Sequence, residues 1–234
     1  MKRLKEYFTQ KRVNKILDIG TGTGEFISVL KDVFNDAEII GIDPYSESLK
    51  DAVKKFPDVQ FKEMTAENLD FDDNRFDLVS MSMALHHLPE IDKSLAEMQR
   101  VVKPKGWIII NELFSDNLNK AQEVHKMYHH FRSRIDRILN VSHNETFRKQ
   151  EILNIVEKSG IKILFHFEFH KNGNLIKSEA DLKLRVAKMN QMLGTIKDSP
   201  EYEELKQQIA EFTKKAKVFG FEMATRVVIV GQVV

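Results

Sequence analysis

Apolar residues along the chain fall into two kinds of pattern. Short continuous runs, such as those around Leu17 and Ile40, are typical of strands buried inside a parallel sheet. Stripes at helical spacing, such as Ile91, Leu95 and Met98, are typical of amphipathic helices. Strands and helices alternate, which predicts an α/β fold with a doubly wound, mostly parallel sheet. The expected strands cover 15–19, 38–43, 59–62, 76–80, 107–111, 161–169 and 225–234, and the expected helices cover 4–9, 24–34, 46–56, 91–102, 116–140, 147–158 and 178–193, with a further helix starting at Ser199.

A glycine-rich turn joins the first strand to the helix that follows it. Gly20, Gly22 and Gly24 stand at alternate positions, and glycine lets a ligand approach the backbone closely. The G-x-G-x-x-G pattern of dinucleotide sites would place its third glycine where Glu25 stands. A carboxylate there would face a pyrophosphate at the helix N-terminus. Asp18, just before the turn, suits a cation, so the turn favours a ligand other than a dinucleotide.

The turn resembles the first motif of class I S-adenosylmethionine-dependent methyltransferases, in the form Asp18-x-Gly20-x-Gly22-x-Gly24. Segments 41–46, 65–71, 85–89 and 101–106 resemble later segments of small-molecule methyltransferases of the ubiquinone-biosynthesis group. The resemblance implies a Rossmann-like, seven-stranded sheet with an antiparallel final strand. It also implies methyl transfer from S-adenosylmethionine to a small-molecule nucleophile, giving S-adenosylhomocysteine. The implied cofactor-binding residues are Asp18, Gly20, Thr21, Gly22, Gly24, Asp43, Pro44, Thr65, Ala66, Glu67, Met81 and Ser82.

Two of these residues carry specific implied roles. Asp18 serves the cofactor ammonium group, and Asp43, at the end of the second strand, accepts hydrogen bonds from the ribose hydroxyls. The alternative for Asp43 is a strand-end residue that starts a turn with Pro44. The family often has Asp where this chain has Thr65, so the adenine contact is open between Thr65 and Glu67, and a polar loop without ligand is the alternative.

The residues that would touch the substrate follow the fourth and fifth strands. His86 is a candidate general base and His87 a candidate substrate contact, because imidazoles titrate near neutral pH. The alternative is that His86 packs beside the cofactor and His87 is a solvated cap. Glu112 ends the fifth strand, where ligands bind in open α/β sheets, and is either a substrate contact or an ordinary surface acid.

Composition narrows the classes of function. The chain has 234 residues, a net charge of +1 and no cysteine, which excludes disulfides, thiolate zinc sites and cysteine nucleophiles. No apolar run approaches the length of a membrane span, and no basic tract with interleaved aromatic residues indicates a nucleic-acid partner. We expect one cytoplasmic methyltransferase domain over 1–234, with no metal.

Two helical segments lie outside the resemblance. Segment 116–146 holds a long helix predicted to be a lid, and over 116–150 seven Lys or Arg stand against four Asp or Glu. This excess suggests an acidic substrate bound by Arg132, Arg134 or Arg137; an ordinary solvated helix is the alternative. Segment 178–218 reads as a helical hairpin inserted between the last two strands, and its apolar stripes make it a candidate homodimer contact or a competing lid.

Two other functions stay open on the sequence alone. One is a regulatory or partner protein that binds S-adenosylmethionine without catalysis. The other is an NAD-dependent oxidoreductase, because Asp43 could also hold the ribose of NAD.

Overall fold

The computed structural model describes residues 1–171 and 173–233. The chain divides into two compact units. Unit 1 comprises Met1–Glu112, Gln150–Phe169 and the chain from Val227 onward, and unit 2 comprises Leu113–Lys149 and His170–Arg226. Unit 2 thus contains both segments, 116–146 and 178–218, that lay outside the resemblance. No helix among the described residues has the length and apolar character needed to cross a bilayer.

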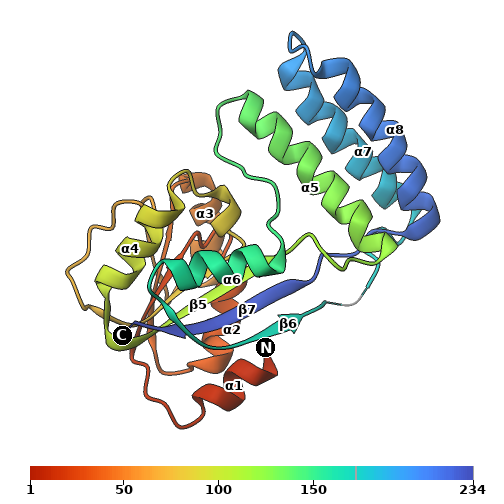
Figure 1. The fold of residues 1–234 in the computed structure, drawn as a ribbon. Coiled ribbons are helices and arrows are strands. Elements are labelled where there is room, and N and C mark those ends of the chain that lie inside the picture. The colour runs from red at the N-terminus through yellow and green to blue at the C-terminus, as the bar shows by residue number, and fades with distance from the viewer. Residues whose placement is uncertain (172, 234) are drawn as a thin grey trace. The chain divides into compact units, whose positions relative to one another are not determined.

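Unit 1 is built on the predicted seven-stranded sheet, whose order is β3-β2-β1-β4-β5-β7-β6 (Figure 1). Ile16 lies opposite both Ile39 and Leu78, and all three are buried, which is why these strands read as continuous apolar runs. The parallel strands are β1 (Lys15–Ile19), β2 (Glu38–Asp43), β3 (Gln60–Glu63), β4 (Phe76–Ser82) and β5 (Val102–Leu113), and the remaining strands are β6 (Lys162–Phe169) and β7 (Arg226–Gln232).

β7 runs antiparallel to β5, as the resemblance implied. Backbone hydrogen bonds join Phe114 to Thr225 near one end of the pair and Gly106 to Val233 at the other. The chain leaves unit 1 after Glu112, at the end of β5, and re-enters it at Val227, at the start of β7. Both points therefore lie at the carboxyl edge of the parallel strands. This is the edge at which open α/β sheets bind ligands.

The fifth strand was expected to begin only at residue 107, after segment 103–106, and this expected start is wrong. These residues belong to β5, whose pairing with β4 jumps from Phe76–Val102 to Leu78–Trp107. Such a bulge lets extra residues leave the ladder while pairing resumes beyond them. Lys105 has a φ of 60° and lies at the bulge. Pro104 and Gly106, which favour turns, therefore lie in an irregular part of β5 rather than in a turn before it.

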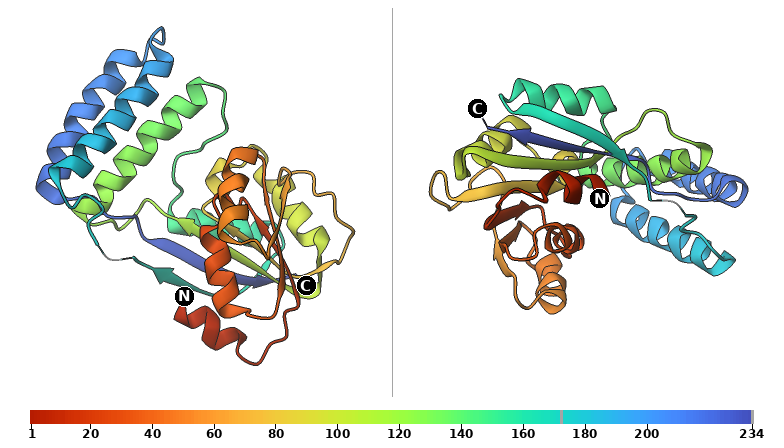
Figure 2. Two further views of the ribbon diagram at one scale, coloured as in Figure 1. Left: turned by 180° about the vertical axis from the view of Figure 1, so that it is seen from behind. Right: turned by 90° about the horizontal axis from the view of Figure 1, so that it is seen from below.

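Helices cover both faces of the sheet in unit 1 (Figure 2). On one face, α1 (Lys2–Phe8) and α2 (Glu25–Val33) bury Phe8 and Ile27 in a cluster with β-strand residues. α3 (Ser46–Lys55) follows β2. On the opposite face lies α6 (Lys149–Lys158), and α4 (Ile91–Val101) is beside it, because the Gln99 side chain donates to the Ser159 carbonyl, 2.9 Å away.

Unit 2 is a bundle of three helices, α5 (Lys120–Ile138), α7 (Glu179–Leu193) and α8 (Tyr202–Phe219) (Figure 1). Phe131, Met189 and Phe212 share its apolar core, so the predicted hairpin of α7 and α8 packs on α5. The bundle is therefore one core made from two separate stretches of sequence.

Two helix starts in unit 2 differ from the prediction. α5 begins after Asn119 rather than at Asp116, because the Asn119 and Gln122 side chains form a reciprocal capping box there. α8 begins at Tyr202 rather than with Pro200 in its first turn. Ser199 accepts instead from the Glu201 and Tyr202 backbone amides, in a tight turn just before the helix.

Candidate active site

The glycine turn after β1 is an open backbone cradle. Gly20, Gly22 and Gly24 have φ values of 68°, 53° and 82°, a region that side chains with a Cβ rarely adopt. A Cβ at Gly20 would come within 2.5 Å of the Ala84 Cβ, and one at Gly24 within 2.8 Å of the Phe56 ring. At Gly22 a Cβ would meet nothing within 4 Å, so the turn presents bare backbone to open space at this position.

Asp18 is buried beneath the turn at the end of β1. Its two carboxylate oxygens accept hydrogen bonds from the Thr21 hydroxyl, at 2.6 Å, and the Ser80 hydroxyl, at 2.7 Å. Burial raises the pKa of Asp18 to about 6, although both hydroxyls oppose the rise and nearby Asp43 adds to it. Among the described residues, only neutral hydroxyls donate hydrogen bonds to this carboxylate, so it is well suited to bind a cationic ligand.

Asp43 ties the end of β2 to the glycine turn. Its Oδ2 accepts from the Gly22 amide at 2.8 Å, and its Oδ1 accepts from the Tyr45 amide at 2.9 Å. Each carboxylate oxygen has a second lone pair, so Asp43 can still accept from ligand hydroxyls while it fixes the turn. Pro44, next to it, is exposed.

The other predicted cofactor contacts differ in exposure. Thr65 is exposed and Ala66 is buried, while Glu67 accepts from the Ser94 hydroxyl at 3.1 Å. The side chain of Met81 is fully buried, opposite Ile19 and Ile110 in the sheet. Of the two adenine candidates, Thr65 is therefore the more exposed.

His86 and Glu112 form a buried carboxylate–histidine pair. His86 lies in the short helix η1 (Leu85–His87), and its Nδ1 is 2.9 Å from Oε1 of Glu112. The side chains are only 2% and 1% exposed. The carboxylate accepts a hydrogen bond from Nδ1–H of the ring, so the lone pair of this tautomer is on Nε2. Glu112, a candidate substrate contact in the sequence, thus contacts His86 itself, and the ring of half-buried His87 lies 4.2 Å from that of His86.

Asn111 and Ser80 are polar site residues that the sequence analysis missed. Asn111 is fully buried and donates to the Ser82 hydroxyl at 2.8 Å, while its Oδ1 has no hydrogen-bond partner among the described residues. Ser80 holds Asp18. Both interrupt apolar strand runs, and a polar residue inside such a run is the signal that would have found them.

The three arginines predicted to bind substrate have different surroundings in unit 2. Arg134 forms a two-pronged ion pair with Glu204, at 2.6 and 2.7 Å, and also bonds Glu201, and these hydrogen bonds raise its pKa. Arg137 donates to the His143 carbonyl at 2.9 Å. Arg132 is half exposed, and its nearest carboxylate, Asp136, is 3.6 Å away. Arg134 therefore ties α5 to α8.

Two histidines of α5, His125 and His130, have lowered pKa values. Burial lowers the pKa of His125 to about 4, with a further contribution from Arg185 and Arg226. Burial also lowers the pKa of His130, whose Nε2 is 2.8 Å from the Thr146 hydroxyl. Neither ring therefore adds positive charge to this segment at physiological pH.

A mostly parallel sheet with a glycine turn after β1 and an acid at the end of β2 defines the Rossmann-like class of nucleoside-binding folds. Comparison with known proteins narrows that class. A family model described as a methyltransferase domain matches residues 17–110. Among solved structures, a candidate methyltransferase of Bacillus halodurans superposes with a TM-score of 0.67 at 20% identity, over 99% of this chain and 97% of that one.

Two relatives carry the comparison further. The demethylmenaquinone methyltransferase of Staphylococcus saprophyticus is 31% identical over 172 residues, which are 70% of this chain and 73% of the relative. A ubiquinone/menaquinone biosynthesis C-methyltransferase of Campylobacter jejuni is 38% identical over 107 residues, or 44% of this chain and 46% of the relative. The chain therefore belongs to the class I S-adenosylmethionine-dependent methyltransferases of the ubiquinone-biosynthesis type. This membership decides against the oxidoreductase alternative.

Proposed function

We propose that unit 1 binds S-adenosylmethionine at the glycine turn and methylates a small molecule at the carboxyl ends of β4 and β5. The observation that carries the proposal is the open backbone at Gly22, flanked by two buried carboxylates, Asp18 and Asp43. A cationic cofactor with a ribose needs this combination of close backbone approach, negative charge and acceptor oxygens.

When bound, S-adenosylmethionine supplies a methyl group already activated on a sulfonium. The residues of the chain then have to bind, align and exclude water. Asp18 balances the charge of the cofactor ammonium, and Asp43 accepts from the ribose hydroxyls while holding the Gly22 amide. Exposed Thr65 contacts the adenine edge, and the unpartnered Oδ1 of Asn111 offers an acceptor beside Ser82.

His86 is the proposed general base. Glu112 holds the proton on Nδ1, which leaves Nε2 to accept a proton from a substrate hydroxyl or acidic carbon. The relatives are named for demethylmenaquinone methylation and for C-methyl transfer. A quinone-type ring bearing a hydroxyl is therefore the first substrate class to test on this protein.

The first test measures cofactor binding by calorimetry with S-adenosylmethionine and S-adenosylhomocysteine. Asp43→Ala removes both carboxylate acceptors, and we expect a loss of about 1.5–3 kcal/mol of binding free energy if the ribose bonds are charge-assisted. Asp58→Ala is the matched control, because Asp58 is an exposed acid that pairs only with Lys31 among the described residues. Unchanged affinity for Asp43→Ala would remove the ribose assignment.

The second test identifies the acceptor. Metabolite extracts and quinone precursors are incubated with the protein and a methyl-labelled cofactor, and the labelled product is identified by mass. A labelled quinone-type product supports the proposal. Tight cofactor binding without any labelled product would favour the regulatory alternative.

Unit 2 is our proposed source of substrate specificity. Its first segment follows β5 directly, so it begins next to Glu112 in the sequence. With Arg134 occupied by α8, Arg132 is the arginine of α5 with the most exposed side chain, at 55%, and is the proposed contact for an acidic group. The outward-facing Leu184 and Val218, 61% and 68% exposed, support a homodimer contact through the hairpin of α7 and α8.

A further inference from the structure

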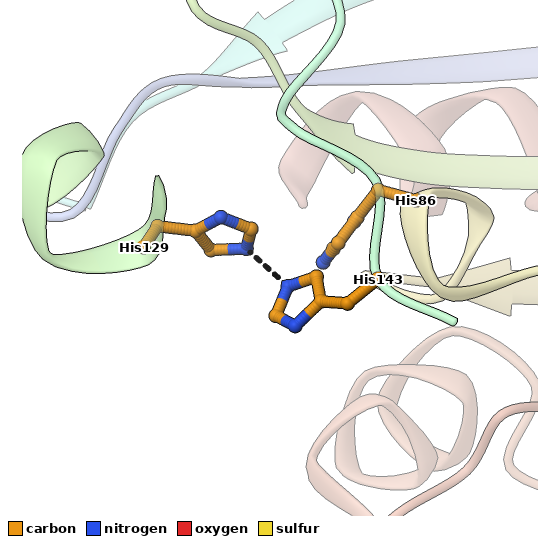
Figure 3. Close-up of side chains that lie close together, drawn as sticks. All are labelled: His86, His129 and His143. Atoms are coloured by element: carbon orange, nitrogen blue, oxygen red, sulfur yellow. Dashed lines mark hydrogen bonds between the residues drawn. The ribbon is translucent and has the colours of Figure 1, made fainter. Parts of the chain in front are cut away.

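Two histidine rings of unit 2 face each other through the same ring nitrogen. His129 belongs to α5, and His143 lies in the loop after this helix. Their Nε2 atoms are 3.4 Å apart (Figure 3). This is long for a hydrogen bond from a ring N–H, for which distances near 2.9–3.0 Å are usual. A direct hydrogen bond between the two rings is therefore weak.

Asp136 determines which nitrogen of His143 carries the proton. Its Oδ2 lies 2.6 Å from Nδ1 of His143, whose side chain is 1% exposed. The Nδ1 proton is donated to this carboxylate, so the lone pair of the neutral ring is on Nε2, facing His129. Histidines that bind metals commonly donate their other ring proton to a carboxylate in this way, which fixes the ring and increases its basicity.

The spacing of the two nitrogens matches a particular coordination geometry. Zinc binds imidazole nitrogen at about 2.0–2.1 Å and is most often tetrahedral, so two nitrogens on one zinc lie about 3.3 Å apart. Two neighbouring nitrogens on an octahedral ion of similar bond length would be about 3.0 Å apart. The observed 3.4 Å matches the tetrahedral value.

We propose that His129 and His143 form a binding site for a divalent, tetrahedral transition metal of the zinc type, with Asp136 as the residue that positions His143. Water or other oxygen or nitrogen donors complete the coordination. The carboxylate of Asp136 offsets part of the metal's charge. Arg132 approaches the same carboxylate at 3.6 Å, and Arg137 bonds the His143 backbone carbonyl rather than its ring. No metal was expected from the sequence, in which the absence of cysteine excludes thiolate zinc sites.

The test uses the full chain without an affinity tag, freed of metal by a chelator. Cobalt(II) is titrated as the probe, because tetrahedral cobalt absorbs far more strongly in the visible than octahedral cobalt, and zinc is then added to displace it. We expect a tetrahedral band that His129→Gln and His143→Gln each weaken at least tenfold in affinity. Asp136→Asn should weaken binding about tenfold, as outer partners of metal-bound histidines do.

His130→Gln is the matched control, because His130 is the neighbour of His129 on α5 and bonds Thr146 instead. It should bind cobalt as the unchanged protein does. If buried His143→Gln does not fold, half-buried His129→Gln carries the test, together with ¹⁵N spectra of the unchanged protein, in which zinc should shift two Nε2 resonances. A weak octahedral spectrum, or equal loss with His130→Gln, would overturn the site.

Discussion

Both units of the molecule contain a buried histidine whose ring is hydrogen-bonded to a carboxylate, and these two pairs are embedded differently. In unit 1, Glu112 ends a sheet strand and His86 lies in the short turn after the neighbouring strand, so the pair joins two rigid elements. In unit 2, Asp136 and His143 are seven residues apart and join a helix to its own following loop. The first pair depends on the sheet, whereas the second is local.

This difference bears on what each pair can do. A histidine fixed between strands at the ligand-binding edge of a sheet is held in place for proton transfer, since a general base must stay within hydrogen-bond reach of the proton it takes. A histidine fixed by a nearby carboxylate on one helix and loop presents its other ring nitrogen to a neighbouring side chain at little structural cost. That arrangement suits a metal ligand, which needs orientation more than surroundings.

The strongest loss of function is expected for a substitution at His86. His86→Ala should lower turnover about 10²–10⁴-fold and leave cofactor affinity unchanged, because the general base would be lost while the glycine turn remains. Steady-state kinetics at saturating substrate, with calorimetry for the cofactor, measure both quantities.

His166→Ala is the matched control, since His166 is exposed on β6. Glu112→Gln sharpens the test, because it keeps the hydrogen-bonding shape beside His86 but removes the charge; an intermediate loss of turnover is expected. A loss below tenfold for His86→Ala would make this pair a packing feature and not a catalytic one.

The next effect concerns pH and the buried Asp18. Because burial raises its pKa from 3.8 to about 6, the folded protein holds a proton here between about pH 4 and pH 6 that the unfolded chain has released. The contribution of Asp18 to the stability of the ligand-free protein is therefore greatest below pH 4 and falls as the pH rises through 6. A cationic cofactor needs the ionised carboxylate, so its affinity should be about tenfold lower at pH 5 than at pH 7.

Calorimetry across this pH range measures the effect on the cofactor, and thermal melts of the free protein measure the effect on stability. Asp18→Asn has no proton to release at this position, so its cofactor affinity should be lower and should not change with pH between 5 and 7. Equal affinity of the unchanged protein at both pH values would separate Asp18 from the cofactor's charge.

The smallest effect is expected in unit 2. Arg134→Ala removes the ion pairs with Glu201 and Glu204, which are partly exposed, so we expect a loss of about 1 kcal/mol in the free energy of unfolding. Arg132→Ala, on the same helix, should leave stability unchanged and raise KM for an acidic substrate. A KM increase for Arg134→Ala alone would reverse these two roles.

Much of unit 1 could be predicted from its sequence because local patterns and tertiary demands agree there. The glycines at 20, 22 and 24 need positive φ, and the structure gives them positive φ. The strands around Leu17 and Ile40 are buried on both faces, so their composition alone indicated them. The bulge in β5 was missed, because Pro104 and Gly106 are typical turn residues, and the strand is seen to continue through them only from the pairing of Val102 and Trp107 with β4.

The side-chain partners were harder to predict than the elements. Glu112 and His86 are 26 residues apart in the sequence, and Arg134 and its partner Glu204 are 70 residues apart. No local sequence pattern therefore predicts either pair. The excess of basic residues in 116–150 predicted an acidic substrate, whereas Arg134 forms its ion pair with an acidic side chain of α8. The excess of basic residues predicted that these side chains would pair with carboxylates, but only the fold shows that some of the carboxylates belong to the protein itself.

The position of β7 has a consequence for the order in which the chain can fold. This strand comes after all the others in the sequence, yet it lies between β5 and β6 in the sheet. On the ribosome, the facing edges of β5 and β6 must stay unpaired until the whole of unit 2 has been synthesised. Exposed strand edges invite association with other chains. The nascent protein therefore carries its greatest risk of aggregation just before its final strand emerges.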